Sequence, residues 1–217
     1  MSGTFKAVLA ITSLSLISSA FAADPIRIGV SGPLTGGSAP MGVSMRDGVK
    51  LAVAEINAKG GVLGRQIQLI ERDDEAKNER GVQVAQELIN KEKVVATVGY
   101  INTGVALASQ RFYQEAKIPV MNNVATGSVI TKQFLPPEHK ENYIFRVSAN
   151  DTIQSAMIVE EAVGKRKLTK VAILADSTNY GQLGREDLEK ALSAKGMKAV
   201  TVEKFNIKDV EIGRAHV

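Results

Sequence analysis

Apolar residues along the chain follow two different periods in turn. Short runs rich in Val and Ile, bounded by turn-forming residues, predict β-strands. Between these runs, apolar residues recur every three or four positions, which predicts amphipathic helices. The strands are expected at residues 26–31, 67–72, 94–98 and 118–121, and the helices around residues 45–56, 82–89 and 105–112. This alternation is typical of an α/β protein whose parallel sheet carries helices on both faces.

The regular pattern lapses between residues 126 and 142, around Pro136 and Pro137. Residues 143–148 are expected to be extended again. A second series then follows, with strands expected at residues 171–175 and 199–202 and helices around residues 156–163 and 188–192. We therefore interpret residues 23–147 as one α/β lobe and residues 148–210 as a second, with a crossover near Ser148. Because the second series has too few elements to close a core of its own, we expect the second lobe to be incomplete.

The last residues, 211–217 (EIGRAHV), continue no preceding element. Back-translated with ordinary codons, they fit the start of a widely used sequencing-library adapter. We therefore expect a C-terminally truncated gene fragment that ends in a non-native tail. A genuine short terminus is the alternative, and sequencing across the junction distinguishes the two.

The first residues have the three parts of a secretory signal peptide in the right order. Lys6 precedes an apolar run over residues 7–22, and Ala20 and Ala22 supply the small residues that signal peptidase requires. A membrane span takes about 20 apolar residues, and this run is too short and too rich in Ser. An uncleaved anchor remains the alternative, whereas a lipoprotein anchor would need a Cys. We expect residues 1–22 to be cleaved and the mature protein to work outside the cytoplasm.

Composition excludes several classes of function. The chain has 27 basic and 23 acidic residues, a formal net charge of +4, and no Cys. The basic residues are interspersed with acids rather than gathered in a stripe, so we do not expect a nucleic-acid partner. Without Cys there are no disulfides and no thiolate metal sites. The two histidines, His139 and His216, form no recognisable catalytic or metal-binding set, so we expect no enzyme activity and no cofactor.

Candidate binding residues follow the strands, because parallel sheets bind ligands beyond the carboxyl ends of their strands. Residues 32–37 (GPLTGG) lack the spacing of a dinucleotide-binding loop, and Pro33 removes one N–H donor. This loop either lines a cleft together with Met41 or is a plain turn. Residues 73–75 (DDE) could suggest a cation site, but we expect them to cap the following helix, and Asp176 to act likewise.

A second candidate, formed by Asn102, Thr103 and Gly104, opens a predicted helix after a strand. A hydroxyl beside free helical N–H groups suits a ligand carboxylate, although Thr103 could also be an ordinary N-cap. Residues 124–127 (VATG) repeat the arrangement after the next strand, which favours a small anionic ligand. In the second lobe, Tyr180 either closes over a ligand held by the first lobe or packs against a neighbouring loop.

Residues 47–52 (DGVKLA), 55–64 (EINAKGGVLG) and 72–74 (RDD) strongly resemble the leucine/isoleucine/valine-binding family of periplasmic proteins. These are the type I substrate-binding components of ABC transporters, and the likeness runs from about Ile26 to Phe205. The resemblance implies the type I periplasmic binding fold, with two Rossmann-like lobes that have parallel sheets and are joined by a hinge. In this fold the ligand lies between the lobes, and the chain returns to the first lobe at its C-terminal end.

The resemblance also implies roles for individual residues. Thr103 matches a Ser or Thr that takes the ligand carboxylate. The backbone at Val124 and the hydroxyl of Thr126 match groups that take the carboxylate and the ammonium. Tyr180 matches a tyrosine that covers the ligand, and Met41 falls where an aromatic residue often sits.

The sequence departs from the family pattern in two places. The loop between Pro33 and Gly42 has extra residues, and Val124 replaces a commoner Ala. The acidic residue that usually fixes the ligand ammonium is expected beyond the end of the match. Relatives with similar first lobes bind amides or aromatic acids, so a carboxylate ligand is better supported than an amino acid as such.

The expected function is therefore solute capture. We expect a periplasmic binding protein that takes up a small carboxylate, with a branched-chain amino acid as the first candidate, and delivers it to the membrane permease of an ABC transporter. One alternative is a ligand-sensing receptor domain of the same fold, and another is a ligand that is an aromatic acid or an amide. An exported α/β enzyme is the remaining class, and it would need acid–base or nucleophilic groups at the strand ends, where none is visible.

Overall fold

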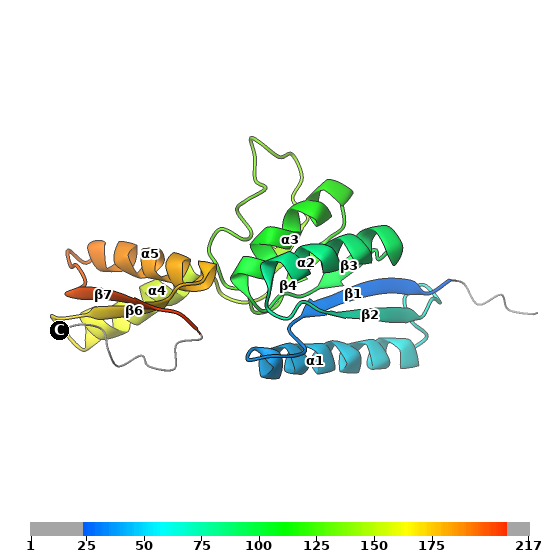
Figure 1. Cartoon of the computed structure of the whole chain (residues 1–217), viewed down its shortest axis with the longest axis horizontal. Helices are drawn as coiled ribbons and strands as arrows, with labels where there is room; N and C mark the ends of the chain where they lie inside the picture. The colour runs from blue at the N-terminus through cyan, green and yellow to red at the C-terminus, as the bar shows by residue number, and fades with distance from the viewer. Residues whose placement is uncertain (1–23, 208–217) are drawn as a thin grey trace, which may run out of the picture.

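A computed structural model of the chain describes residues 24–207. The expected signal peptide, residues 1–22, and the expected non-native tail, residues 211–217, lie outside the described residues. The structure contains two parallel sheets that lie side by side along the long axis of the molecule (Figure 1). None of the helices within residues 24–207 combines the length and apolar character that crossing a membrane requires.

The first sheet has five strands in the order β2-β1-β3-β4-β5, and all neighbouring pairs are parallel. Its strands are β1 (Ile26–Gly32), β2 (Ile67–Asp73), β3 (Ala96–Val98), β4 (Val120–Asn122) and β5 (Ile144–Arg146). Its helices are α1 (Ala39–Ala58), α2 (Asn78–Gln86) and α3 (Thr103–Ala116). Helix α1 lies on one side of this sheet and helices α2 and α3 lie on the other (Figure 1). The predicted α/β class with helices on both faces of a parallel sheet is confirmed.

Alternation of side chains along the strands places apolar clusters on both faces of the first sheet. The core under α2 and α3 is the larger, and it contains Val105, Tyr113, Val120 and Ile144 among its buried members. The core under α1 is built around Val30, Met45 and Ile101. The first lobe (β1 to β5 with α1 to α3) is thus a three-layer α/β unit.

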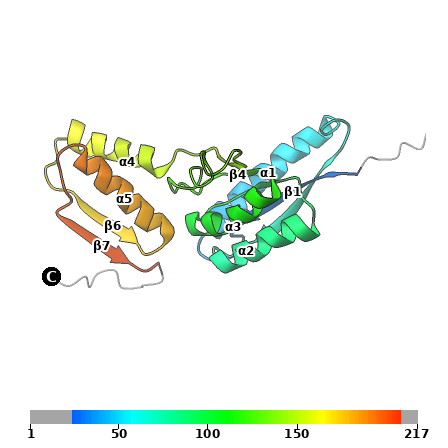
Figure 2. The same cartoon turned by 90° about the horizontal axis from the view of Figure 1, so that it is seen from above.

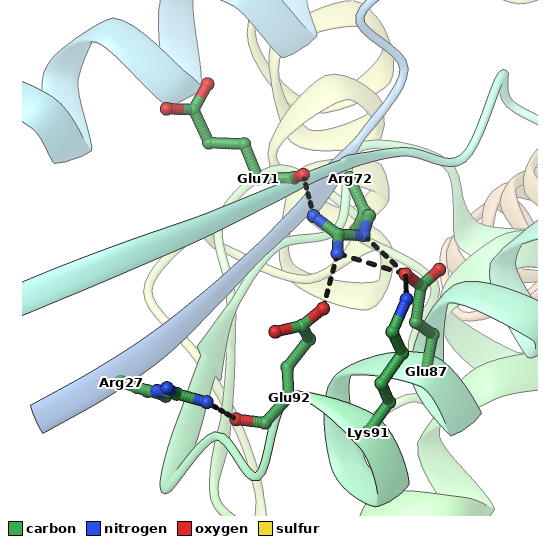
Figure 3. A network of polar contacts seen from close by, with 6 residues as sticks. All are labelled: Arg27, Glu71, Arg72, Glu87, Lys91 and Glu92. Atoms are coloured by element: carbon green, nitrogen blue, oxygen red, sulfur yellow. Dashed lines mark hydrogen bonds and ion pairs between the residues drawn. The ribbon is translucent and has the colours of Figure 1, made fainter.

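An ion-pair network fastens the end of α2 to the strand that precedes it (Figure 3). After α2 the helix continues as a π-helical segment, η1 (Glu87–Lys91), where the sequence predicts a regular helix. Arg72, on β2, binds Glu87 and Glu92 at 3.0 and 2.8 Å through its Nη2. Arg27, on β1, donates to the Glu92 carbonyl at 3.0 Å. The first residue of η1 and the residue that follows η1 are therefore held against β1 and β2.

The second lobe begins after a long irregular segment, where the sequence pattern also lapses. It contains α4 (Asp151–Val159), η2 (Glu160–Lys165), β6 (Ala172–Asp176), α5 (Asn179–Ser193) and β7 (Thr201–Phe205). Strands β6 and β7 form a two-stranded parallel sheet. Val159, Ile173 and Leu192 form its core, whereas Leu174, on the other face of β6, is 61% exposed. Figure 2 shows α4 and α5 side by side in this lobe.

Candidate ligand-binding site

The candidate residues of the first lobe gather at the carboxyl ends of β1, β3 and β4. Strand β1 is flanked by β2 on one side and β3 on the other, so the strand order reverses at β1. Such a reversal opens a crevice at the carboxyl ends of the central strands, and ligands of open α/β sheets bind there. Backbone bonds connect the loops at this edge: Gly99 donates to the Met121 carbonyl, and Asn123 donates back to Gly99, both at 3.1 Å.

Thr103 lies at the start of α3 with only 1% of its surface exposed. Its Oγ1 accepts a hydrogen bond from the Gly127 N–H at 3.3 Å, which leaves the hydroxyl proton able to donate to another group. Ala106 makes the first bond of the helix, to the Asn102 carbonyl at 3.0 Å. The amides of residues 103–105 therefore have no partner within the helix. A hydroxyl donor beside these amides can bind a carboxylate.

The expectation that Thr103 could cap α3 is wrong, because the N-cap residue is Asn102. The Asn102 side chain makes no capping bond either. Its Nδ2 donates to Ser38 Oγ at 3.4 Å, across the crevice, while its Oδ1 is buried and has no hydrogen-bond partner among residues 24–207. Asn102 thus connects the start of α3 to the residue before α1 instead of closing the helix end.

Val124 and Thr126 do not repeat the helix start seen at Thr103, so that expectation is wrong. The amides of Val124 and Ala125 both donate to the Tyr100 carbonyl, at 3.3 and 3.0 Å, and turns follow instead of a helix. The Thr126 carbonyl accepts from the Asp151 N–H at 2.9 Å. Burial raises the pKa of the Asp151 carboxyl, and the Thr126 side chain opposes this shift. Thr126 therefore contacts the start of α4 through its backbone carbonyl.

Met41 and Val124 share an open groove beside α1. Met41 is 52% exposed and Val124 is 37% exposed. The groove has a volume of about 730 Å³, and it is lined by apolar or small side chains of α1 and by Asn123. The structure thus brings these two predicted site residues together, and Thr103 and Thr126 do not line the same groove.

Tyr180 follows the first residue of α5 and is 50% exposed. The helix is capped by Thr178, which accepts from the Gly181 N–H at 3.5 Å, and Asp176 accepts from the Thr178 N–H at 2.8 Å. Asp176 therefore holds the capping residue instead of capping α5 itself. Partial burial, and then the charges of Asp151 and Asp176, raise the pKa of the Tyr180 phenol. The phenol accordingly stays protonated and able to donate a hydrogen bond.

The expected capping role of residues 73–75 is wrong, because the N-cap residue of α2 is Lys77. Asp73 instead holds the loop after β1: its carboxylate accepts from the Leu34 N–H at 2.8 Å and from the Thr35 hydroxyl at 2.6 Å. Asp74 is 1% exposed and accepts from Ser31 Oγ at 3.2 Å. Burial raises the pKa of Asp74 to about 6. The two carboxylates therefore hold the carboxyl end of β1 and the loop that follows it.

Two residues that the sequence analysis did not single out connect the lobes. Arg146, at the end of β5, donates to the Gly127 carbonyl at 3.0 Å and to the Ser148 carbonyl at 3.2 Å. Asp151 opens α4 with 5% of its surface exposed, and burial raises the pKa of its carboxyl. No local pattern distinguishes these residues from ordinary surface charges, because Gly127 and Thr126, their partners across the chain, are distant in sequence. Among residues 24–207, no group of three or more His, Cys, Asp or Glu is placed to hold a metal ion.

Comparison with known proteins gives one consistent family. A family model described as periplasmic binding protein matches residues 25–213. The Leu/Ile/Val-binding protein homolog 2 of Brucella abortus is 34% identical over 182 residues, which is 84% of this chain and 47% of that relative. The chain thus spans about half the length of the curated relatives that it matches.

Solved structures agree with the fold. The branched-chain amino acid transporter substrate binding protein LivJ of Streptococcus pneumoniae, in complex with isoleucine, gives a TM-score of 0.76 at 26% identity, covering 87% of this chain and 52% of that one. A solute binding protein of an ABC transporter from Rhodopseudomonas palustris, in complex with 3,4-dihydroxybenzoic acid, gives a TM-score of 0.71 at 29% identity. That match covers 84% of this chain and 47% of that one. The implied type I periplasmic binding fold is confirmed. The family model and the leucine/isoleucine/valine-binding relatives together show that this chain belongs to the periplasmic binding protein family.

Proposed function

We propose that this chain serves as the periplasmic solute-binding component of an ABC transporter and captures a small carboxylate. The first candidate ligand is a branched-chain amino acid, because LivJ is described in complex with isoleucine. The observation that carries the proposal is the start of α3. There, Thr103 Oγ1 accepts from Gly127, so its proton is available beside amides that have no helical partner.

The ligand carboxylate would lie at this helix start, where the hydroxyl and the amides all donate to it. The partial positive charge at the N-terminus of α3 adds to the attraction. In this proposal residues 23–147 and 148–210 form the two walls of a cleft, and Tyr180 approaches the ligand from the second wall. Closure about the crossover near Ser148 would then couple binding to recognition by a membrane permease. The protein would act without catalysis or cofactor.

The apolar part of the ligand would face the groove that Met41 and Val124 line. Its open, apolar lining accepts a branched aliphatic chain, and it also accepts a ring. The Rhodopseudomonas palustris neighbour is described in complex with an aromatic acid, so aromatic acids are the second candidate ligands. The two classes share a carboxylate and differ in the ammonium group.

A thermal-shift and calorimetric screen tests this proposal. The compounds are leucine, isoleucine, valine, 4-methylpentanoate, benzoate, 4-hydroxybenzoate and short amides. A ligand present at 100 times its Kd should stabilise the protein by ~2.7 kcal/mol. A preference for leucine over 4-methylpentanoate would show that the ammonium is recognised. If no carboxylate shifts the unfolding transition, the proposed function is wrong.

A matched pair of variants tests the role of Thr103. Thr103→Val removes the hydroxyl and keeps the side-chain shape, whereas Thr103→Ser keeps the hydroxyl. We expect at least tenfold weaker carboxylate binding in Thr103→Val and near-normal binding in Thr103→Ser. Equal loss of affinity in both variants would contradict a role for the hydroxyl.

A further inference from the structure

The first turn of α5, in the second lobe, rests directly on backbone of the first lobe. Gly104 is the second residue of α3, and a Cβ at this position would lie 2.8 Å from Asn179 Oδ1. Asn179 is the first residue of α5. The same Cβ would lie 2.8 Å from Oδ1 of Asn78, which opens α2. Two Asn side chains, one from each lobe, therefore converge on a backbone position that has no side chain.

A second glycine makes the same kind of contact. A Cβ at Gly127 would lie 3.3 Å from Leu183 Cδ1, on α5, and 2.4 Å from Thr103 Cγ2. Asn179 and Leu183 are four residues apart, so they lie on the same face of α5. That face of the second lobe thus meets two glycines of the first lobe, each next to the proposed carboxylate site.

Backbone conformation does not explain either glycine. Neither Gly104 nor Gly127 has a positive φ, so an Ala could adopt both conformations. Gly is also a poor helix former, and Gly104 lies within α3. The close approach of Asn179 from the second lobe and of Asn78 from the first accounts for the absence of a side chain at Gly104, and contact with Thr103 and Leu183 accounts for it at Gly127.

We propose that Gly104 and Gly127 form a seat for the first turn of α5 and thereby set how far the two lobes close. Tyr180 lies on this turn, so the seat also fixes the position from which its phenol approaches the ligand. The two glycines are positioning residues and need not touch the ligand themselves. This inference rests on the proposed function for its effect on affinity, but the closure itself can be measured without any ligand.

The absence of Cys in the chain makes closure directly measurable. The exposed residues Glu55, on α1, and Lys190, on α5, can be replaced by Cys and labelled with a fluorophore pair. We expect Gly104→Ala to lengthen the inter-lobe distance. It should leave the unfolding temperature equal or higher, because Ala favours the helix. For a carboxylate that the unchanged protein binds, affinity should fall about tenfold, mainly through faster dissociation.

Gly184→Ala is the matched control, because Gly184 lies within α5 and a Cβ there would meet nothing within 4 Å. It should leave the inter-lobe distance and the affinity unchanged. Shortening the opposing side chain tests which contact matters. Asn179→Ala should restore the distance in the Gly104→Ala background, whereas Asn78→Ala should not, because Asn78 belongs to the first lobe.

The distance measurement decides the inference. An inter-lobe distance in Gly104→Ala equal to that in Gly184→Ala would overturn the seat, as would equal rescue by Asn78→Ala and Asn179→Ala. If Gly104→Ala fails to fold, the Asn179→Gln variant enlarges the opposing side chain instead, and it should lengthen the same distance. If no carboxylate binds the unchanged protein, the proposed function fails while the distance measurement still tests the seat.

Discussion

Asp74 should make the stability of this protein depend on pH in a way that one substitution removes. Its carboxyl is 1% exposed, and burial raises its pKa from 3.8 to about 6. Hydrogen bonds from the Ala76 N–H and the Ser31 hydroxyl oppose the shift but do not cancel it. One pKa unit corresponds to about 1.4 kcal/mol. The difference between the folded and unfolded pKa values therefore costs about 3 kcal/mol once the carboxyl is ionised in both states.

The direction of this pH dependence follows from which state, folded or unfolded, holds the Asp74 proton more tightly. Between pH 3.8 and about 6 the folded protein keeps the proton of Asp74 while the unfolded chain has lost it. The unfolding free energy thus falls as pH rises through this window, and it levels off above it. Asp74→Asn keeps an acceptor oxygen and cannot ionise. The variant should be about as stable as the unchanged protein near pH 4 and about 3 kcal/mol more stable at pH 7.

Urea unfolding of both proteins at half-unit steps from pH 4 to pH 8 measures this difference. Other carboxyls titrate over the same range, and subtracting one curve from the other removes their contribution. Ser31→Ala is the control for a lost hydrogen bond, and it should lower stability by about 1 kcal/mol at pH 7. A stability difference between Asp74→Asn and the unchanged protein that stays constant from pH 4 to pH 8 would refute the reasoning.

Three further predictions concern interactions within each of the two lobes. Arg72→Gln should destabilise the first lobe by about 1–2 kcal/mol in equilibrium unfolding, because the partly buried ion pairs with Glu87 and Glu92 are lost. Since salt screens these pairs, the destabilisation should be smaller in about 1 M NaCl. Leu192→Ala should cost about 2–5 kcal/mol, since Leu192 is 1% exposed in the second core. Leu174 is 61% exposed, so Leu174→Ala should change stability by less than about 0.5 kcal/mol in the same assay. An equal effect of the two Leu substitutions would contradict the assigned core.

The order of strands and helices could be read from the sequence because apolar periodicity reports local structure. Strands β1 and β2 begin at the predicted residues. Strand β3 begins later than predicted, because Val94 donates to the Leu88 carbonyl at 3.1 Å and closes the turn after η1. The apolar periodicity does not reveal this later start, since Val94 is buried whether it belongs to the strand or to the turn before it.

The candidate site was predictable only in part, for a related reason. Thr103 was recognisable because a strand end followed by a helix start has a local signature. Asp74 and Asp151 had no such signature, since burial and distant partners set their chemistry. The bond from the Asp151 N–H to the Thr126 carbonyl depends on how the second lobe meets the first, and the spacing of residues along the chain contains no information about that.

The strand order explains why the proposed anion site needs no recognisable motif. From β1 the chain passes to α1 on one face of the sheet, and from β3 it passes to α3 on the other. The N-termini of both helices therefore border one crevice, and Asn102 Nδ2 joins Ser38 Oγ at 3.4 Å between them. Two helix starts that border one crevice favour negative charge whatever the remainder of the ligand is. This arrangement would therefore select ligands that share a carboxylate and differ elsewhere. The groove at Met41 and Val124 would then distinguish an aliphatic chain from a ring.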